Sequence, residues 1–417
     1  MSSSLRRLGI TLGDPGGIGP EVALKAVCES TAVFVPVIFG PVSVLDHVAA
    51  LTEKFDIHFL AMPKNGEKHK GLRPLNPSQG QQADSSIMGI QPFNKAQGPA
   101  EPFENPNREN STIGTGIQRA KPFENPDEGN SAIGTGIQRA EPFENPFVFS
   151  FPAEPGKKKQ VFWVSTGDTP LDIGTVCAAN GTHAYTAIQL ATEACLSGQL
   201  DGIVTAPICK EAMAMAGAPF TDHTTLLASL AQAEVSMGFY SGPLRVVLVS
   251  VHCALSDVGR HITPDTLGRA CRHAVTLARY HRQRVPKETP IRIAVAGLNP
   301  HAGENGLFGH EEIAVIAPTI AALRAEGLPV EGPFPADTLF HHAYQGAFDV
   351  VVAMYHDQGL IPVKMLAFDT AVNVTIGLPF VRTSPDHGTA FSLAYQDKAD
   401  HRSFAAALDL ALHWDWR

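Results

Sequence analysis

Short apolar runs alternate with longer helical patterns through most of this chain of 417 residues. Each run is almost free of polar side chains over roughly four to eight residues, a length typical of strands. Strands that are apolar along their whole length are typical of parallel sheets covered by helices on both faces. The pattern therefore predicts an α/β fold with a mostly parallel sheet. The expected strands are residues 8–12, 33–39, 202–205, 244–251, 291–296, 350–354 and 372–376.

The helical patterns carry start and break signals. Thr263 followed by Pro264 predicts a helix cap and first turn, with the helix running to about Tyr280. Pro318 lies inside another helical pattern and predicts a kink. Pro36 weakens the strand expected at 33–39, because proline cannot donate to a strand ladder. The expected helices are residues 20–26, 186–196, 209–216, 263–280, 311–326 and 404–412.

Composition narrows the class of protein. The formal charge of −9 and the absence of a dense Lys/Arg stripe argue against a nucleic-acid surface. No apolar run approaches the length that crosses a bilayer, and no long apolar segment follows the first arginines, so neither a membrane span nor a secretion signal is expected. The six cysteines form no CxxC pair, which fits reduced thiols in a cytoplasm.

A twenty-residue repeat interrupts the α/β pattern. The sequence SxIGTGIQRAxPFENP occurs around 111–126 and again around 131–146, with polar, proline- and lysine-rich flanks. Such a stretch buries too little apolar area to offset the entropy of ordering it. We interpret residues 66–156 as one inserted, mostly disordered segment, and a tolerated repeat expansion is preferred over a docking element. Its GTG runs lack the glycine pattern and the preceding strand of a dinucleotide loop.

Three expected strands are each followed by a histidine, namely His252, His301 and His356. In open α/β sheets ligands bind beyond the carboxyl ends of the strands. One such histidine alone indicates a partly exposed turn residue, but three imidazoles at one edge predict a site for a divalent cation. Asp337 and Asp357 are candidates to orient the imidazoles or to contact the cation themselves.

Two turns also carry polar side chains or glycines. The turn GDPGGIGPE at 13–21 lets backbone approach a ligand and leads into a helix, although a purely structural turn explains it equally well. In TDHTTLL at 221–227, His223 and Thr224 lie at a helix start that favours an anion. An ordinary helix cap is the preferred interpretation from these residues alone.

Near the C-terminus, Lys364, Asn373 and Arg382 are groups suited to clamp a carboxylate or phosphate. Taken singly, each is more typical of a solvated surface. The segment RTSPDHGTA at 382–390 is interpreted as a loop between a strand and a helix that contacts a nucleotide.

Together these segments resemble the PdxA family of 4-hydroxythreonine-4-phosphate dehydrogenases and close relatives. The resemblance covers the chain on both sides of the insert. The matching segments, in the family's order, are GDPGGIGPE, DGIVTAPICKEAM, the HTT of 221–227, GLNPHAGENGLFGHEE, GPFPADTLF, YHDQGLIPVK and VNVTIGLPFVRTSPDHGTA.

The resemblance implies a fold like that of isocitrate and isopropylmalate dehydrogenases, with two α/β/α subdomains. Residues 1–65, 157–215 and 345–417 would form the first subdomain, and 216–344 the second with the dimer interface. It also implies a homodimer whose active sites are completed across that interface.

By motif match, His252 and His301 would bind the metal from one subunit and His356 from the other. The phosphorylated substrate would be held by His223, Thr224, Lys364, Asn373 and Arg382. Asp386, His387, Gly388 and Thr389 would contact NAD or NADP. Lys364 is the candidate to exchange the proton, assisted by Asp357 or Asp337.

The implied reaction oxidises the secondary hydroxyl of 4-phosphohydroxy-L-threonine with NAD and a divalent cation, such as Zn, Mg, Co or Mn, and the β-keto acid then loses CO2. This step belongs to pyridoxal phosphate synthesis. The alternative within the family is a catabolic dehydrogenase of 4-phosphothreonate or 4-phosphoerythronate. A catalytically idle scaffold whose insert is its working part is the least favoured hypothesis, because all the implied catalytic groups are present.

Two departures from the family pattern bear on the substrate. GDPGG stands where many relatives have GDPAG, a change that we expect to matter little. TDHTT stands where relatives often have TGHT, which places the charge of Asp222 beside the implied phosphate site.

Overall fold

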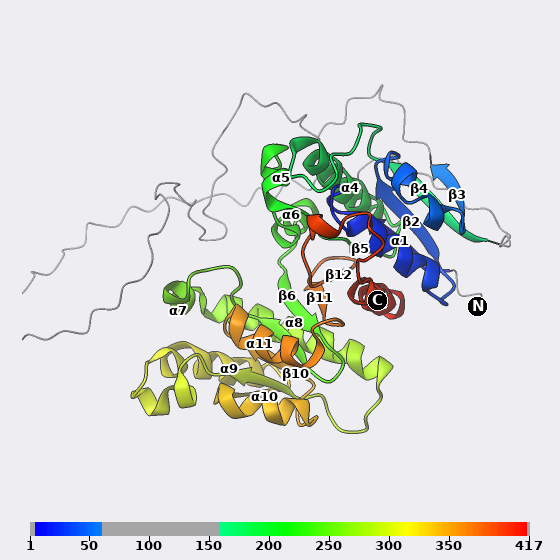
Figure 1. Cartoon of the computed structure of the whole chain (residues 1–417). Coiled ribbons are helices and arrows are strands. Elements are labelled where there is room, and N and C mark those ends of the chain that lie inside the picture. Colours follow the sequence, from blue (N-terminus) through cyan, green and yellow to red (C-terminus); the bar gives the residue numbers. More distant parts are fainter. Residues whose placement is uncertain (1–4, 61–157, 415–417) are drawn as a thin grey trace, which may run out of the picture. The chain divides into compact units, whose positions relative to one another are not determined.

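The computed structural model describes residues 5–60 and 158–414, so the insert expected at 66–156 lies outside the described residues. The described part contains one sheet with the strand order β3-β4-β2-β1-β5-β12-β11-β6-β7-β10-β8-β9 (Figure 1). The strands are β1 (Arg7–Thr11), β2 (Val35–Gly40), β3 (Phe55–Leu60), β4 (Lys159–Ser165), β5 (Gly202–Thr205), β6 (Ser236–Tyr240), β7 (Arg245–Leu248), β8 (Ile293–Ala296), β9 (Val330–Phe334), β10 (Val350–Ala353), β11 (Val372–Ile376) and β12 (Val381–Pro385).

Helices connect these strands. They are α1 (Gly19–Glu29), α2 (Val44–His47), α3 (Ala49–Thr52), α4 (Ala178–Leu196), α5 (Lys210–Met215), α6 (His223–Ala231), α7 (Val258–His261), α8 (Pro264–Arg284), α9 (Ala317–Ala325), α10 (Ala336–Tyr344), α11 (His356–Ala367) and α12 (Arg402–His413).

The sheet consists of two parallel parts joined by an antiparallel centre. Strands β3, β4, β2, β1, β5 and β12 are parallel neighbours, and so are β7, β10, β8 and β9. Between the two parts, β12, β11, β6 and β7 pair in antiparallel fashion. The predicted α/β fold with a mostly parallel sheet is confirmed. The boundary between the two expected subdomains stays a prediction.

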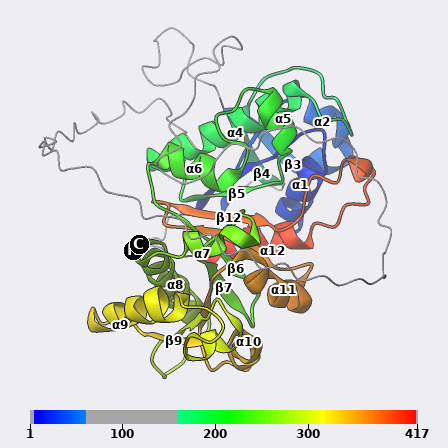
Figure 2. The ribbon, with the colours of Figure 1, turned by 90° about the vertical axis from the view of Figure 1, so that its left-hand side faces the viewer.

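Helices cover both faces of the sheet, which explains why strands such as β8 and β10 are apolar along their whole length. In β10, Val350 and Val352 pack in the core that includes α8, while Val351 and Ala353 pack in the core beside α10 and α11. Around β1 and β2 the same alternation separates a core with α1 and α12 from a core with α4. Figure 2 shows α8 and α9 beside each other.

Several expected boundaries match the structure, and the differences have local reasons. The strands at 202–205 and 372–376 are confirmed, and the side chain of Thr263 caps α8 as expected. Pro36 is tolerated in β2 because the pairing with β4 begins only at Val37. The stretch at 311–326 divides into a π-helical turn, Glu312–Ile316, and α9, with Pro318 in the first turn of α9.

One expected loop is a buried strand. Residues 382–385, interpreted from sequence as part of a nucleotide-contacting loop, belong to β12 between β5 and β11. Their polar composition concealed the strand, since Arg382, Thr383 and Ser384 are all buried.

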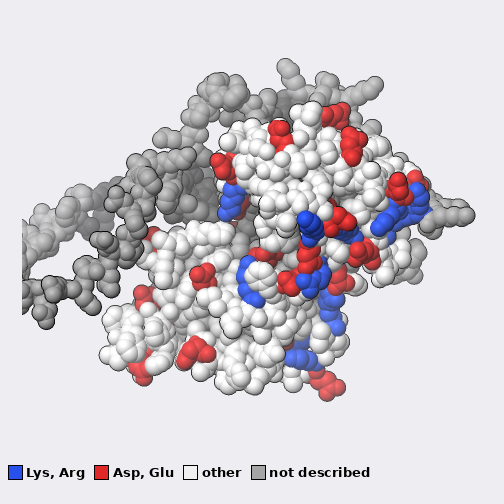
Figure 3. Space-filling model, in the orientation of Figure 1, with Lys and Arg blue, Asp and Glu red and all other residues white. Residues whose placement is uncertain are grey.

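On the face shown in Figure 3, basic and acidic side chains are intermixed. No helix in the described ranges is long and apolar enough to cross a membrane.

Candidate active site

The strands that precede the three histidines are direct neighbours. β10 pairs in parallel with β7 on one side and with β8 on the other, so their carboxyl ends meet at one edge. His252 follows β7, and His356 is the first residue of α11 after β10. His301 follows β8 within the 3-10 segment Pro300–Gly306. The expected placement of all three at strand ends is confirmed.

Two of these histidines lie together within one chain. The ring centroids of His252 and His356 are 5.6 Å apart. The Nδ1 atom of His356 lies 2.7 Å from Oδ1 of Asp357, which leaves Nε2 of the ring available to a ligand. His301 pairs with Glu304 instead, and its side chain is 62% exposed. In the described part of this single chain, no three His, Cys, Asp or Glu side chains converge as a metal site would require.

The histidine pair suits a cation. Partial burial lowers the pKa of His252, with the charges of Lys210 and His356 acting in the same direction. A neutral imidazole is the form that binds a metal. The two imidazoles are neighbours within one chain and fit two ligands of the expected site. The assignment of His252 and His356 to different subunits stays a prediction.

The loop that carries His301 is held in an unusual conformation. Residues 301–305 all have φ between 45° and 81°, and only Gly303 among them is a glycine. Left-handed backbone is costly for other residues and concentrates at functional sites. The buried carboxylate of Glu312 anchors the base of this loop by accepting the backbone N–H groups of Leu298 and Asn299 at 2.7 and 2.8 Å. Sequence reasoning missed Glu312, although an acid in an apolar helical stretch is a usable signal.

A polar cavity of about 180 Å³ brings most of the expected substrate residues together. Its walls come from the ends of β5 and β12, the starts of α5, α6, β6 and β11, and the segment after β7. The lining residues are Thr205, Ala206, Pro207, Ile208, Lys210, Asp222, His223, Thr224, Met237, His252, Asn373, Arg382, Ser384, Pro385, His387 and Gly388. Of the expected substrate residues, only Lys364 does not line it. Sequence reasoning missed Thr205, Lys210 and Ser384.

Arg382 is the principal buried cation of this cavity. Its side chain belongs to a residue only 2% exposed, and it donates to Thr375 Oγ1 at 2.9 Å and Thr205 Oγ1 at 2.8 Å. Burial lowers the pKa of Arg382 to about 10, and the charge of Asp222 acts in the opposite direction. A guanidinium with such a pKa still carries its charge at neutral pH.

His223 and Asn373 leave polar atoms free for a ligand. Burial and then the charge of Arg382 hold the pKa of His223 well below its usual value, so its ring is neutral. Four buried polar atoms lining the cavity have no hydrogen-bond partner in the described part of the chain: His223 Nε2, Asn373 Oδ1, Arg382 Nε and His387 Nε2. An unsatisfied buried polar group costs about 1–3 kcal/mol. An anionic group would accept from the nitrogen atoms of this set, and a ligand hydroxyl would donate to Asn373 Oδ1.

The start of α6 contains both a helix cap and residues that line the cavity. Asp222 caps the helix, because its Oδ1 accepts the N–H of Thr225 at 3.0 Å. His223 and Thr224 nevertheless line the cavity beside Arg382. The cap and the ligand-binding role are therefore compatible.

The expected catalytic residues lie outside this cavity. Lys364, on α11, forms an ion pair with Asp386, its Nζ lying 3.0 Å from Oδ2. Asp357 is bound to His356, and Asp337 is exposed in the first turn of α10. The Lys364–Asp386 pair links α11 to the segment expected to bind the cofactor.

That segment, Asp386–Thr389, packs against the GDPGG turn. The N–H of Ile18 donates to Thr389 O at 2.9 Å, and a Cβ on Gly17 would lie 2.7 Å from the same oxygen. Gly388 has open space around it, as a ligand-contacting residue requires. A Cβ on Gly16 would lie 2.3 Å from Asn180 Nδ2 and 2.6 Å from Asp172 O, so alanine at this position would require these neighbours to shift.

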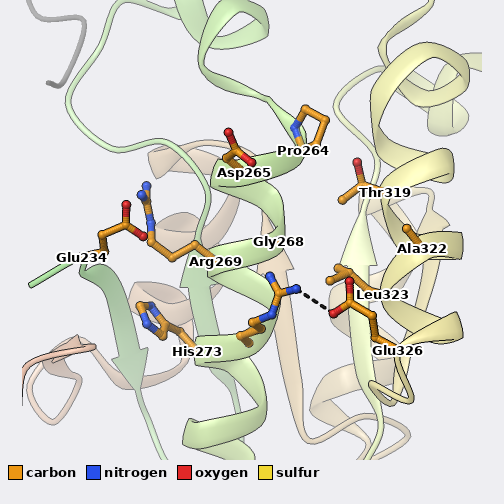
Figure 4. A pocket seen from close by; sticks show the side chains of 11 residues that line it. Glu234, Pro264, Asp265, Gly268, Arg269, His273, Thr319, Ala322, Leu323 and Glu326 are labelled. Carbon is orange, nitrogen blue, oxygen red and sulfur yellow. Dashed lines mark hydrogen bonds and ion pairs between the residues drawn. The ribbon is translucent and has the colours of Figure 1, made fainter. Parts of the chain in front are cut away.

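A larger cavity of about 570 Å³ lies elsewhere, between α8 and α9 (Figure 4). None of the sequence-predicted site residues lines it. Arg272 and Glu326 cross it as an ion pair of 2.7 Å, and Glu234 and Asp265 add acidic groups. Because the acids offset its arginines, this cavity lacks the cationic character of the site around Arg382.

Comparisons with known proteins identify the family of this chain. The family model described as pyridoxal phosphate biosynthetic protein PdxA matches residues 132–411. A 4-hydroxythreonine-4-phosphate dehydrogenase of Beijerinckia indica subsp. indica is 51% identical over 240 residues, covering 57% of this chain and 70% of the relative. A D-threonate 4-phosphate dehydrogenase of Salmonella typhimurium is 48% identical over 244 residues, covering 58% and 73%.

A solved structure of the same family is similar to this chain. The crystal structure of 4-hydroxythreonine-4-phosphate dehydrogenase from Klebsiella pneumoniae matches with a TM-score of 0.65 and 32% identity, covering 98% of this chain and 99% of that one. The expected enzyme class, an oxidoreductase acting on a CH–OH group, is confirmed by these relatives. This chain belongs to the PdxA family.

Proposed function

We propose that this protein oxidises the secondary hydroxyl of 4-phosphohydroxy-L-threonine with NAD and a divalent cation, in pyridoxal phosphate biosynthesis. The observation that carries the proposal is the cavity in which buried Arg382 meets His223, Thr224 and Asn373, and which extends to His252. A phosphate at one end of such a substrate places its hydroxyl within reach of the histidine edge.

The cavity residues hold the phosphate in this proposal. Arg382 supplies a fixed charge, since Thr205 and Thr375 orient its guanidinium before any ligand arrives. His223 donates from a neutral ring, and Thr224 adds a hydroxyl at the helix start. Asn373 offers its amide to the same ligand.

His252, His356 and His301 would hold the cation. When bound, a divalent cation supplies Lewis acidity that favours proton loss from the substrate hydroxyl, and NAD accepts the hydride. Asp357 orients the ring of His356 through Nδ1. Loss of CO2 from the β-keto acid completes the reaction.

Lys364 is the proposed proton-exchanging group, with Asp357 or Asp337 assisting. In the structure its ammonium is held by Asp386. For Lys364 to reach a substrate, this ion pair has to open, and the segment Asp386–Thr389 has to bind NAD without it. In this proposal, opening of the Lys364–Asp386 ion pair couples NAD binding to proton exchange.

We further propose that the enzyme is a homodimer. Helix α11, which carries His356 and Lys364, also carries Ile361 and Met365, and Phe368 follows it directly; these three residues are 59, 81 and 74% exposed. Their spacing of four and three residues places them on one helix face. A second copy of the chain covering this stripe would lie beside the histidine edge and complete it.

D-threonate 4-phosphate is the second candidate substrate. Curated relatives named as dehydrogenases of that compound are 48 and 47% identical to this chain, close to those named for the first substrate. The two compounds share the phosphate and the hydroxyl, so the cavity around Arg382 does not separate them.

A substrate panel tests the proposal. Purified protein is mixed with 4-phosphohydroxy-L-threonine, D-threonate 4-phosphate or phosphoerythronate, with NAD and the divalent cation omitted in turn, and NADH formation is followed. NADH formation is expected with the first compound and only when both additions are present. Far faster turnover of either other compound would assign the catabolic function instead.

A further inference from the structure

Asp222 lines a cavity that otherwise suits an anion. It shares the lining with the cationic Arg382 and Lys210 and with three histidines, His223, His252 and His387. Burial keeps His223 neutral, and the charge of Asp222 acts on both His252 and Arg382. An acid in this position needs a reason, since it repels the ligand that its neighbours attract.

Helix capping explains the role of only one of the two carboxylate oxygens of Asp222. Its Oδ1 accepts the N–H of Thr225 at 3.0 Å. The cap uses this one oxygen, and Asp222 as a whole is only partly buried. Serine and asparagine cap helices as well as aspartate does, so capping alone does not require a charge.

An ionised carboxylate accepts hydrogen bonds and cannot donate them. The doubly charged form of a phosphate monoester has no hydrogen to offer, and it is repelled. The singly charged form carries one P–OH group and can donate it in a charge-assisted hydrogen bond. The second pKa of a phosphate monoester is about 6, so both forms are accessible near neutral pH.

We propose that Asp222 makes this cavity selective for the singly protonated form of a phosphate monoester over its dianion and over oxyanions without a proton. The inference deepens the proposed function, because it rests on a phosphate monoester binding beside Arg382. It assigns Asp222 as a specificity-determining residue and predicts that substrate binding weakens as pH rises through the second pKa of the phosphate.

The test uses methyl phosphate and methyl sulfate as matched probes. Methyl sulfate keeps a single charge and no proton, so its binding reports every titrating protein group that acts on both probes, including His387 and His252. The ratio of the two affinities isolates the proton of the phosphate. Isothermal titration calorimetry of the full-length protein at pH 5.0 and 7.5 gives this ratio without any dependence on turnover.

For the wild-type protein, methyl phosphate is expected to bind about tenfold more tightly than methyl sulfate at pH 5.0, the worth of one charge-assisted hydrogen bond. This preference is expected to fall as the pH rises to 7.5. In Asp222→Asn the slope reverses, because the amide caps the helix and donates to the dianion. Asp222→Ser, a cap without charge, is the second variant.

Asp265→Asn removes the same charge at the start of α8, away from this cavity, and is expected to behave as the wild type. A wild-type preference that rises with pH would overturn the assignment of Asp222, and this result does not depend on whether the variants fold. Failure of both esters to bind at either pH would overturn the anion cavity itself, and with it the proposed function.

Discussion

The anion cavity and the histidine edge differ in how complete they are within one chain. The cavity has a buried guanidinium fixed by two threonines, a neutral histidine and a capped helix start. The edge has two neighbouring imidazoles, while the third lies on an exposed loop of left-handed backbone. Strands and a helix start preorganise the first region, whereas the second depends on a strained loop and, in our proposal, on a second subunit. Binding and chemistry are therefore expected to respond differently to mutation.

The largest effect is expected from His356→Ala. If the edge performs the chemistry, loss of this ligand lowers kcat by at least about a thousandfold, since His356 is the imidazole whose ring lies 5.6 Å from that of His252. Binding of methyl phosphate is expected to stay within about twofold. His413→Ala, an exposed histidine on α12, serves as the matched control. Equal loss of anion binding would show that the two regions are not separable.

Arg382→Met tests the cavity, where a loss of substrate binding is expected. Removal of the buried guanidinium is expected to raise KM for the phosphorylated substrate by about a hundredfold, corresponding to about 3 kcal/mol for charged hydrogen bonds. The variant leaves Thr205 and Thr375 with hydroxyls that can bond elsewhere. Arg382→Lys is expected to recover only part of the loss, because an ammonium cannot reproduce both bonds. A change confined to kcat contradicts this role.

Met365→Glu places a charge in the apolar stripe of α11. If a second copy covers the stripe, the dimer is expected to dissociate, and activity falls because the histidine edge is incomplete. Light scattering coupled to size-exclusion chromatography measures the mass, and methyl phosphate binding reports whether each chain keeps its cavity. Glu326→Gln, at the exposed residue that follows α9, is the control for an unrelated surface substitution. A monomeric wild type with full activity would show that the histidine edge does not need a second subunit.

Glu312→Gln is expected to have a moderate effect. The amide oxygen can still accept the two backbone N–H groups that donate to Oε1, but the amide NH2 cannot accept from Asn299 Nδ2, which donates to Oε2 at 2.9 Å, so the His301 loop relaxes. We expect a loss of about 1–3 kcal/mol in the free energy of unfolding and a larger loss in kcat than in anion affinity. Thermal unfolding and steady-state kinetics on one preparation distinguish the two. An unchanged kcat would show that the loop has no part in the chemistry.

The smallest effect concerns Asp14 in the GDPGG turn. Burial raises its pKa to about 6 from 3.8, so the folded state binds this proton more tightly than the unfolded chain. Its contribution to stability is fully present below pH 3.8 and is lost as pH rises through 6, on the order of 2 kcal/mol. Asp14→Asn removes that loss, so its stability relative to wild type is expected to rise between pH 4 and 7. Parallel pH profiles of the two proteins would contradict this assignment.

Periodic patterns made the regular elements predictable. The apolar runs that became β5, β7, β8, β10 and β11 lie in two-faced cores, and burial on both faces favours apolar residues at most of their positions. β12 was missed because its arginine and threonine are buried through hydrogen bonds formed in the folded state. The same reason hid Thr205 and Glu312 from the site prediction, since their partners are distant in sequence.

The sequence by itself determined the family, the α/β class and the positions of the histidines after their strands, because local periodicity and long motifs record these features. Only the tertiary structure decided which histidines are neighbours, since that depends on β10 lying between β7 and β8. It also decided that Asp222, a helix cap by local sequence, faces the same cavity as Arg382, which lies 160 positions away in β12. Contacts of that kind arise from strand order, and the strand order depends on packing over the whole sheet.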